Sequence, residues 1–190
     1  MRLFFLIFSI VIFLSSCFKA QVLSAGIYIT ANNFVKKQPE FTPKNRKIYK
    51  VKQHYLFNNH LIKIKYDTNT IILNTDTLYG YCNTKNQSFR FYRQKTYAIL
   101  NPNEIELLLY SLSYLGGYKH SQIITNYYFS TTTSTQLIAL TVSNLKIAYG
   151  SNLQFCNLLS AYINTPDDLL NYNATTKTYL LNTLLKKQIE

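Results

Sequence analysis

The sequence lacks an apolar run long enough to cross a membrane. Its longest run, residues 3–14, holds twelve residues with only Ser9 polar, whereas a membrane-spanning helix needs about 20 apolar residues. A run of this length behind the cationic start Met1-Arg2 is instead typical of an export signal. We therefore expect the protein to be exported, with residues 1–20 as its signal segment.

Motifs of the common catalytic sites are also missing. The chain has no G-x-S-x-G nucleophile elbow and no cysteine–histidine arrangement. His54 and His60 lack the i,i+4 spacing of a helical zinc site, and no acid stands close to them in the sequence. We therefore expect surface histidines, no metal site and no cofactor.

Gly26-Ile27-Tyr28 suggests a GIY-type nuclease, but the rest of such a site is missing. That site needs a second Tyr-x-Gly strand shortly downstream and a glutamate that holds a metal ion. The nearest candidate, Leu78-Tyr79-Gly80, lies about fifty residues away and has the wrong order. We interpret Gly26-Ile27-Tyr28 as the first strand, followed by Thr30 as the cap of a short helix over 31–37.

Acidic residues are scarce, with eight against 20 lysines and arginines, so the formal net charge is +12. A basic surface attracts anionic lipid, polysaccharide or nucleic acid. The alternative is that the basic charge reflects compositional drift without function, since the chain is rich in the residues that an AT-rich genome encodes most readily. The glycines of an RNA-recognition signature are missing, so we expect an anionic glycan rather than nucleic acid. The candidate anion-binding residues, if they share one wet face, are Lys63, Lys65, Arg90 and Arg93.

Only three cysteines occur, and the first stands at the end of the signal segment. Leu14-Ser15-Ser16-Cys17 has the order of a lipobox, which predicts cleavage before Cys17 and lipidation of its thiol. A cut after Ala20, giving plain secretion, and a retained anchor are the two alternatives. The lipobox reading predicts a periplasmic or outer-membrane protein held by a lipid anchor.

Cys82 and Cys156 are the remaining pair. A disulfide between them is one interpretation, because disulfides persist in oxidising compartments. The other is a buried thiol at Cys156, which shares the apolar pattern Leu153, Cys156, Leu159 of an expected helix.

Residues 21–140 predict a β-rich body. Ile62 and Ile64 alternate with Lys63 and Lys65, and residues 88–93 repeat this pattern with Phe89 and Phe91 against Arg90. Polar breaks separate further short β-branched or aromatic runs. This spacing predicts an antiparallel meander that closes as a barrel or stacks as a sandwich. The Ser/Thr tract at 130–135 is expected to connect two strands.

Residues 141–190 predict short helices packed on the same domain. Thr141 is expected to cap the first, Ser151 the second, and Thr165-Pro166 to begin a third. A last helix is expected from Thr176 onward. The predicted fold class is therefore α+β, a β-rich body followed by C-terminal helices.

Several short motifs follow one another along the chain in a recognisable order. They are Gly26-Ile27-Tyr28-x-Thr30-x-x-x-Phe34, Gly80-Tyr81 ahead of Phe89-Arg90-Phe91-Tyr92, Tyr97-x-Ile99-Leu100, Tyr128-Phe129-Ser130 and Leu140-Thr141-x-x-Asn144-Leu145-Lys146. In this order they resemble a family of uncharacterised exported proteins and lipoproteins of Bacteroidota. The resemblance covers most of the mature chain, and it implies export but no catalytic residues.

Two hypotheses of function follow. The first is a non-catalytic envelope protein that binds a partner protein or an anionic glycan, or serves a structural role. The second is a hydrolase of envelope polymers, in which the fold gathers carboxylates such as Asp67, Asp76 and Glu104 across a cleft.

Overall fold

The computed structural model describes residues 24–42, 50–53, 60–66, 69–116 and 122–187. The signal segment, Cys17, His54 and Asp67 lie outside these residues. Export and lipidation therefore stay predictions from the sequence.

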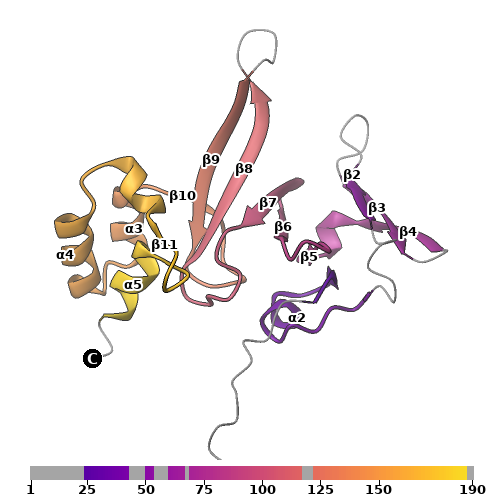
Figure 1. Ribbon diagram of the computed structural model, residues 1–190, viewed down its shortest axis with the longest axis horizontal. Coiled ribbons are helices and arrows are strands. Elements are labelled where there is room, and N and C mark those ends of the chain that lie inside the picture. The colour runs from indigo at the N-terminus through magenta and orange to yellow at the C-terminus, as the bar shows by residue number, and fades with distance from the viewer. Residues whose placement is uncertain (1–23, 43–49, 54–59, 67–68, 117–121, 188–190) are drawn as a thin grey trace, which may run out of the picture.

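A seven-stranded antiparallel sheet forms the centre of the protein and curls as a half-barrel (Figure 1). In spatial order its strands are β1 (Gly26–Tyr28), β5 (Gly80–Cys82), β6 (Ser88–Tyr92), β7 (Lys95–Ile99), β8 (Leu108–Gly116), β9 (Gln122–Ser130) and β10 (Ile138–Ala139). From β5 to β10, neighbouring strands are consecutive in the chain. The expected α+β class and antiparallel meander are confirmed.

Short turns join β5 to β6 and β6 to β7. Arg93 and Gln94 form the two-residue turn between β6 and β7, and both have positive φ angles, 46° and 64°. Two positive φ values are the signature of a type I′ turn, whose twist matches that of the flanking strands. Between β5 and β6, the Asn83 side chain accepts hydrogen bonds from the N–H groups of Lys85 and Gln87.

A second sheet of three strands is inserted between β1 and β5. Its strands are β2 (Lys50–Gln53), β3 (Leu61–Tyr66) and β4 (Asn69–Asn74), and the 3-10 helix η1 (Thr75–Thr77) leads from it to β5. Ile62 and Ile64 of β3 are fully buried, whereas Lys63 and Lys65 are exposed. The predicted alternation in this strand is confirmed.

Different layers cover the two faces of the seven-stranded sheet. On one face, Ile27 packs with Ile62 and Ile64 of the three-stranded sheet. Farther along that face, Phe129 packs in one cluster with Leu184 and other apolar side chains of the C-terminal helices. Figure 1 shows these two layers at opposite ends of the sheet. The opposite face, here called the tyrosine face, carries Tyr28, Phe34, Tyr79, Cys82, Tyr97, Ile99, Leu108 and Tyr110.

One short helix lies on the tyrosine face. This helix, α2 (Ala31–Val35), begins as expected after Thr30, whose hydroxyl accepts a hydrogen bond from the N–H of Asn33 at 3.1 Å. Its Phe34 is buried against the rings of Tyr28 and Tyr79. The Gly-Ile-Tyr sequence is therefore a strand that packs a helix, as interpreted from the sequence.

The C-terminal segment is helical, as expected. Its elements are α3 (Val142–Ala148), α4 (Leu153–Tyr162), the 3-10 helix η3 (Pro166–Leu170), the hairpin strands β11 (Tyr172–Asn173) and β12 (Thr178–Tyr179), and α5 (Leu180–Lys186). Thr141 caps α3 by accepting from the N–H of Asn144. The prediction that Ser151 caps α4 is wrong, because Asn152 takes this position and accepts from the N–H of Phe155. The last helix begins at Leu180, because the residues before it pair as β12.

Candidate functional site

The first candidate from the sequence, an anion-binding patch, is not formed as predicted. Arg90 is only 5% exposed and lies on the tyrosine face, whereas Lys63 and Lys65 are exposed on the three-stranded sheet. Arg93 is exposed in the β6–β7 turn. The alternation of β6 was assigned to the wrong face, because the sheet is covered on both sides there and Phe89 is only half-buried.

Arg90 has a structural environment instead. Its guanidinium carbon lies 5.3 Å, 5.4 Å and 5.7 Å from the ring centres of Tyr79, Tyr92 and Tyr110. Nη1 donates a hydrogen bond to the hydroxyl of Tyr110 at 3.2 Å, and Nη2 donates to the carbonyl of Thr135 at 2.9 Å. Aromatic faces and carbonyl dipoles thus stabilise a buried cation. The contact to Thr135 also holds the Ser/Thr connection between β9 and β10 against the sheet.

Tyr79, one of the tyrosines around Arg90, is protonated over the physiological pH range. Burial raises the pKa of Tyr79 far above its ordinary value, and the neighbouring Tyr110 raises it further, whereas the charge of Arg90 acts in the opposite direction. The hydroxyl of Tyr110 also lies 3.0 Å from that of Ser130, which donates to the carbonyl of Thr132 at 2.7 Å. These contacts link Arg90, Tyr110 and Ser130 on the tyrosine face to the Ser/Thr connection between β9 and β10.

Of the two interpretations of Cys82 and Cys156, the structure has the one without a disulfide. Both residues are thiols. Cys82 is buried in the tyrosine-face cluster, and Cys156 lies on α4, where its thiol points to the carbonyl of Tyr149 at 3.5 Å. The two thiols belong to different layers of the fold, and spacing in the sequence does not reveal this.

Two of the three acids proposed for a hydrolase, Asp76 and Glu104, lie in the described part of the chain and have separate partners. Asp76 lies 2.6 Å from Nδ1 of His60, a hydrogen-bond contact that the sequence did not suggest because sixteen positions separate the two residues. Glu104 accepts a hydrogen bond from Lys186 of α5 at 2.7 Å. Within the ranges that the structure describes, no group of three or more His, Cys, Asp or Glu residues could hold a metal ion.

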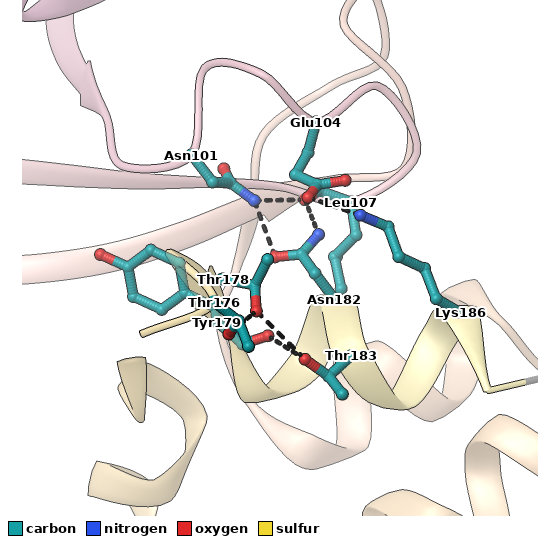
Figure 2. Close-up of polar contacts among 9 residues, drawn as sticks. All are labelled: Asn101, Glu104, Leu107, Thr176, Thr178, Tyr179, Asn182, Thr183 and Lys186. Carbon is teal, nitrogen blue, oxygen red and sulfur yellow. Dashed lines mark hydrogen bonds and ion pairs between the residues drawn. The ribbon is translucent and has the colours of Figure 1, made fainter. Parts of the chain in front are cut away.

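A buried pair of asparagines joins the last helix to the sheet (Figure 2). Asn101 follows β7, and its side chain donates to the carbonyl of Leu107 at 2.7 Å and to the side-chain oxygen of Asn182 at 2.9 Å. Its own oxygen accepts from the N–H of Leu109, and Asn182 donates to the carbonyl of Leu107 at 2.8 Å. The buried amides are well supplied with partners, so this cluster is a structural clamp. Sequence patterns did not single out either asparagine.

Two adjoining hollows lie beside the helical segment, and the larger one is also bordered by β9 and β10. The larger, of about 360 Å³, is bordered by Tyr127 and Asp167, and the smaller, of about 210 Å³, by Val142. Pro166 borders both. Beside them, the N–H groups of Thr165 and Asn164 donate to the carboxylate of Asp168 and hold its pKa below the usual value.

The hairpin of β8 and β9, which projects from the body (Figure 1), carries exposed apolar side chains on neighbouring rungs. We call residues 112–116 and 122–126 the distal hairpin. Leu115 and Ile123 are 63% and 74% exposed, and Tyr114 and Ile124 are 45% and 36% exposed. Leu115 pairs with Ile123, and Tyr114 pairs with Ile124. Adjacent rungs point to opposite faces, so apolar side chains cover both faces of the ribbon.

None of the helices in the described part of the chain has the length and apolar character that a bilayer crossing requires. Comparison of the chain with protein-family models, with curated proteins and with solved structures finds no match. The candidate site is therefore defined by its geometry, and the distal hairpin presents four exposed apolar side chains on two adjacent rungs.

Proposed function

We propose that the protein is an exported, lipid-anchored envelope protein that acts as a non-catalytic binding module through its distal hairpin. The apolar run at residues 3–14, the Leu14-Ser15-Ser16-Cys17 sequence that follows it, and the resemblance to exported Bacteroidota proteins support export and anchoring. The observation that carries the binding role is the cluster of exposed apolar side chains on the distal hairpin. Contiguous apolar patches on a protein surface mark interaction sites, whereas single exposed apolar residues are ordinary.

The contacts of the polar residues support a binding role over a catalytic one. Arg90 and Asn182, which are both buried, hold a connection and a helix in place. Asp76 and Glu104 each pair with a basic residue from another part of the chain. These side chains stabilise the body that presents the hairpin.

Anchoring is tested by metabolic labelling with a fatty acid. We expect the label to enter the wild-type protein and the Cys156→Ser control, and to be absent from Cys17→Ser. Labelling of Cys17→Ser, or a mature protein that starts at Gln21, would show that the protein is not anchored through Cys17.

The binding role is tested on a chain exported behind an ordinary cleavable signal in place of residues 1–20, so that only the folded body can hold it to isolated envelopes. We expect the double variant Leu115→Ser, Ile123→Ser to lose co-sedimentation with envelopes. The matched control is Ile147→Ser, Leu153→Ser, which changes side chains that are 77% and 73% exposed on α3 and α4. Equal sedimentation of the two double variants would overturn the hairpin as the binding element.

A further inference from the structure

We propose that the distal hairpin dips into the headgroup region of an anionic lipid surface, so that the protein meets the membrane at a second point besides its N-terminus. The inference rests on the proposed function, because it takes the distal hairpin as the binding element and names its partner. Four features of the hairpin carry it.

The first feature is that the apolar side chains lie on both faces of the ribbon. Tyr114 and Ile124 form the rung on one face, and Leu115 and Ile123 form the next rung on the other. A flat protein surface would cover one face and leave the other in water. A lipid interface surrounds an inserted ribbon, so both faces lose contact with water together.

The second feature is the depth of the apolar part. The two apolar rungs span about 7 Å at about 3.4 Å per residue. They are followed toward the body by a polar rung, in which the hydroxyls of Ser113 and Thr125 lie 2.8 Å apart. Interfacial elements bury their apolar side chains about 5–10 Å into the boundary between headgroups and acyl chains. The apolar part of the hairpin has this length.

The third feature is the backbone at the outer edges of the ribbon. β8 pairs with β7 through Tyr110 and Ser111, and the pairing of β9 with the β10 segment ends at Tyr127. Beyond these residues, no strand in the described part of the chain covers either outer edge. Unpaired backbone groups are costly in hydrocarbon but stay hydrated among headgroups, so the ribbon fits a shallow position and not a bilayer crossing.

The fourth feature is charge. The sequence has no acidic residue between Glu106 and Asp167, a stretch that contains the whole hairpin, and the chain as a whole carries a formal charge of +12. Approach to an anionic surface is therefore favourable over the protein as a whole, and no carboxylate of the hairpin opposes it. Tyrosine at position 114 also suits an interface, where its ring lies among apolar groups and its hydroxyl meets water.

The absence of tryptophan from the sequence allows a direct test. The full chain is reconstituted in vesicles of phosphatidylcholine with phosphatidylglycerol, and in vesicles of phosphatidylcholine alone. A single tryptophan is introduced as Leu115→Trp on one face, Tyr114→Trp on the other, or Ile147→Trp on α3 as the control. Tryptophan emission and its quenching by brominated lipid are measured for each variant.

We expect emission to move to shorter wavelength at positions 114 and 115, with strong quenching by brominated lipid in the anionic vesicles. Position 147 should keep the emission of a water-exposed tryptophan. Quenching at only one of positions 114 and 115 would overturn the inference in favour of a flat partner. A blue shift without quenching would overturn it in favour of pairing between two copies, and equal quenching in the neutral vesicles would overturn the anionic surface.

The two proposals fail in different ways. If the hairpin double variant loses envelope binding while tryptophan at 114 and 115 stays exposed to water in vesicles, the binding role stands and the partner is a protein or glycan. If the hairpin double variant sediments like the Ile147→Ser, Leu153→Ser control, the binding role of the hairpin is itself wrong.

Discussion

The end of the β8–β9 hairpin nearest the body, here called the proximal end, and the distal hairpin contain similar residues but differ in burial. At the proximal end, Leu108, Leu109 and Phe129 are fully buried. At the distal end of the same two strands, Leu115 and Ile123 are mostly exposed. Strand-forming, apolar sequence therefore determines that the ribbon forms, and the layers packed against it determine which part of the ribbon belongs to the core.

Both faces of the proximal end are covered. The helices pack on the face of Phe129, and the Ser/Thr connection, held by Arg90, lies over the face of Tyr110. In the described part of the chain the distal rungs have no such layers. The comparison predicts that substitutions at the two ends differ in their effect on stability, and four variants test it.

The largest effect is expected for Phe129→Ala. This change leaves a cavity between the sheet and the helices, so the free energy of unfolding should fall by about 3–5 kcal/mol. Chemical denaturation monitored by circular dichroism measures it. Tyr127→Ala, an aromatic truncation on the same strand and face at a side chain that is 37% exposed, should cost much less. Equal costs would show that the helices do not cover the proximal end as described.

A smaller effect is expected for Asn182→Ala, which removes the amide that holds α5 against the start of β8. The change removes one of the donors to the carbonyl of Leu107 and the side-chain partner of Asn101, so the free energy of unfolding should fall by about 1–3 kcal/mol. Lys186→Ala on the same helix breaks only the ion pair with Glu104 and should cost less than about 1 kcal/mol. A greater loss from the lysine variant would assign the clamp to the wrong residues.

The next effect is expected for Tyr110→Phe. The change removes the oxygen that accepts from Arg90 and contacts Ser130, so the free energy of unfolding should fall by about 1–2 kcal/mol. Amide exchange in the Ser/Thr connection should also become faster. Tyr114→Phe, the same change at the distal end, should leave both measurements unaltered. An unaltered connection in the Tyr110 variant would mean that this hydroxyl does not hold it.

The smallest effect is expected for Leu115→Ser, because the side chain is already in water. The free energy of unfolding should change by no more than about 0.5 kcal/mol, measured by the same denaturation experiment. A loss of stability comparable with that of Phe129→Ala would mean that the distal hairpin is part of the core. The two ends of the hairpin would then not differ in burial.

The sequence predicted the fold class well because local patterns carry it. The alternation around Ile64, the cap at Thr141 and the proline that begins η3 all act over a few residues, and the structure has each of them. The predicted site was less successful, because it depended on which strands and layers meet. Arg90 alternates like an exposed residue, and only the second covering layer makes it buried.

Long-range partners account for the other errors. The Asn101–Asn182 contact joins residues that are 81 positions apart, and no local signal marks either one. The disulfide interpretation rested on the number of cysteines and the expected compartment, and neither carries information about the layers in which the two thiols lie. The exposure of Leu115 and Ile123 likewise depends on where the covering layers end, and no local pattern in the sequence indicates it.

The insertion of the three-stranded sheet has a consequence for the order of folding. Most neighbours in the seven-stranded sheet are joined by short connections, such as the two-residue turn between β6 and β7, but β1 must find β5 across the chain from Ile29 to Tyr79. Closing that loop costs roughly 3 kcal/mol more entropy than closing a two-residue turn. We therefore expect β1 to join the sheet late in refolding and to detach first on partial unfolding. In native-state hydrogen exchange, the amide of Tyr28 should then open at a lower free energy than the amides of β6, which lies inside the sheet between β5 and β7.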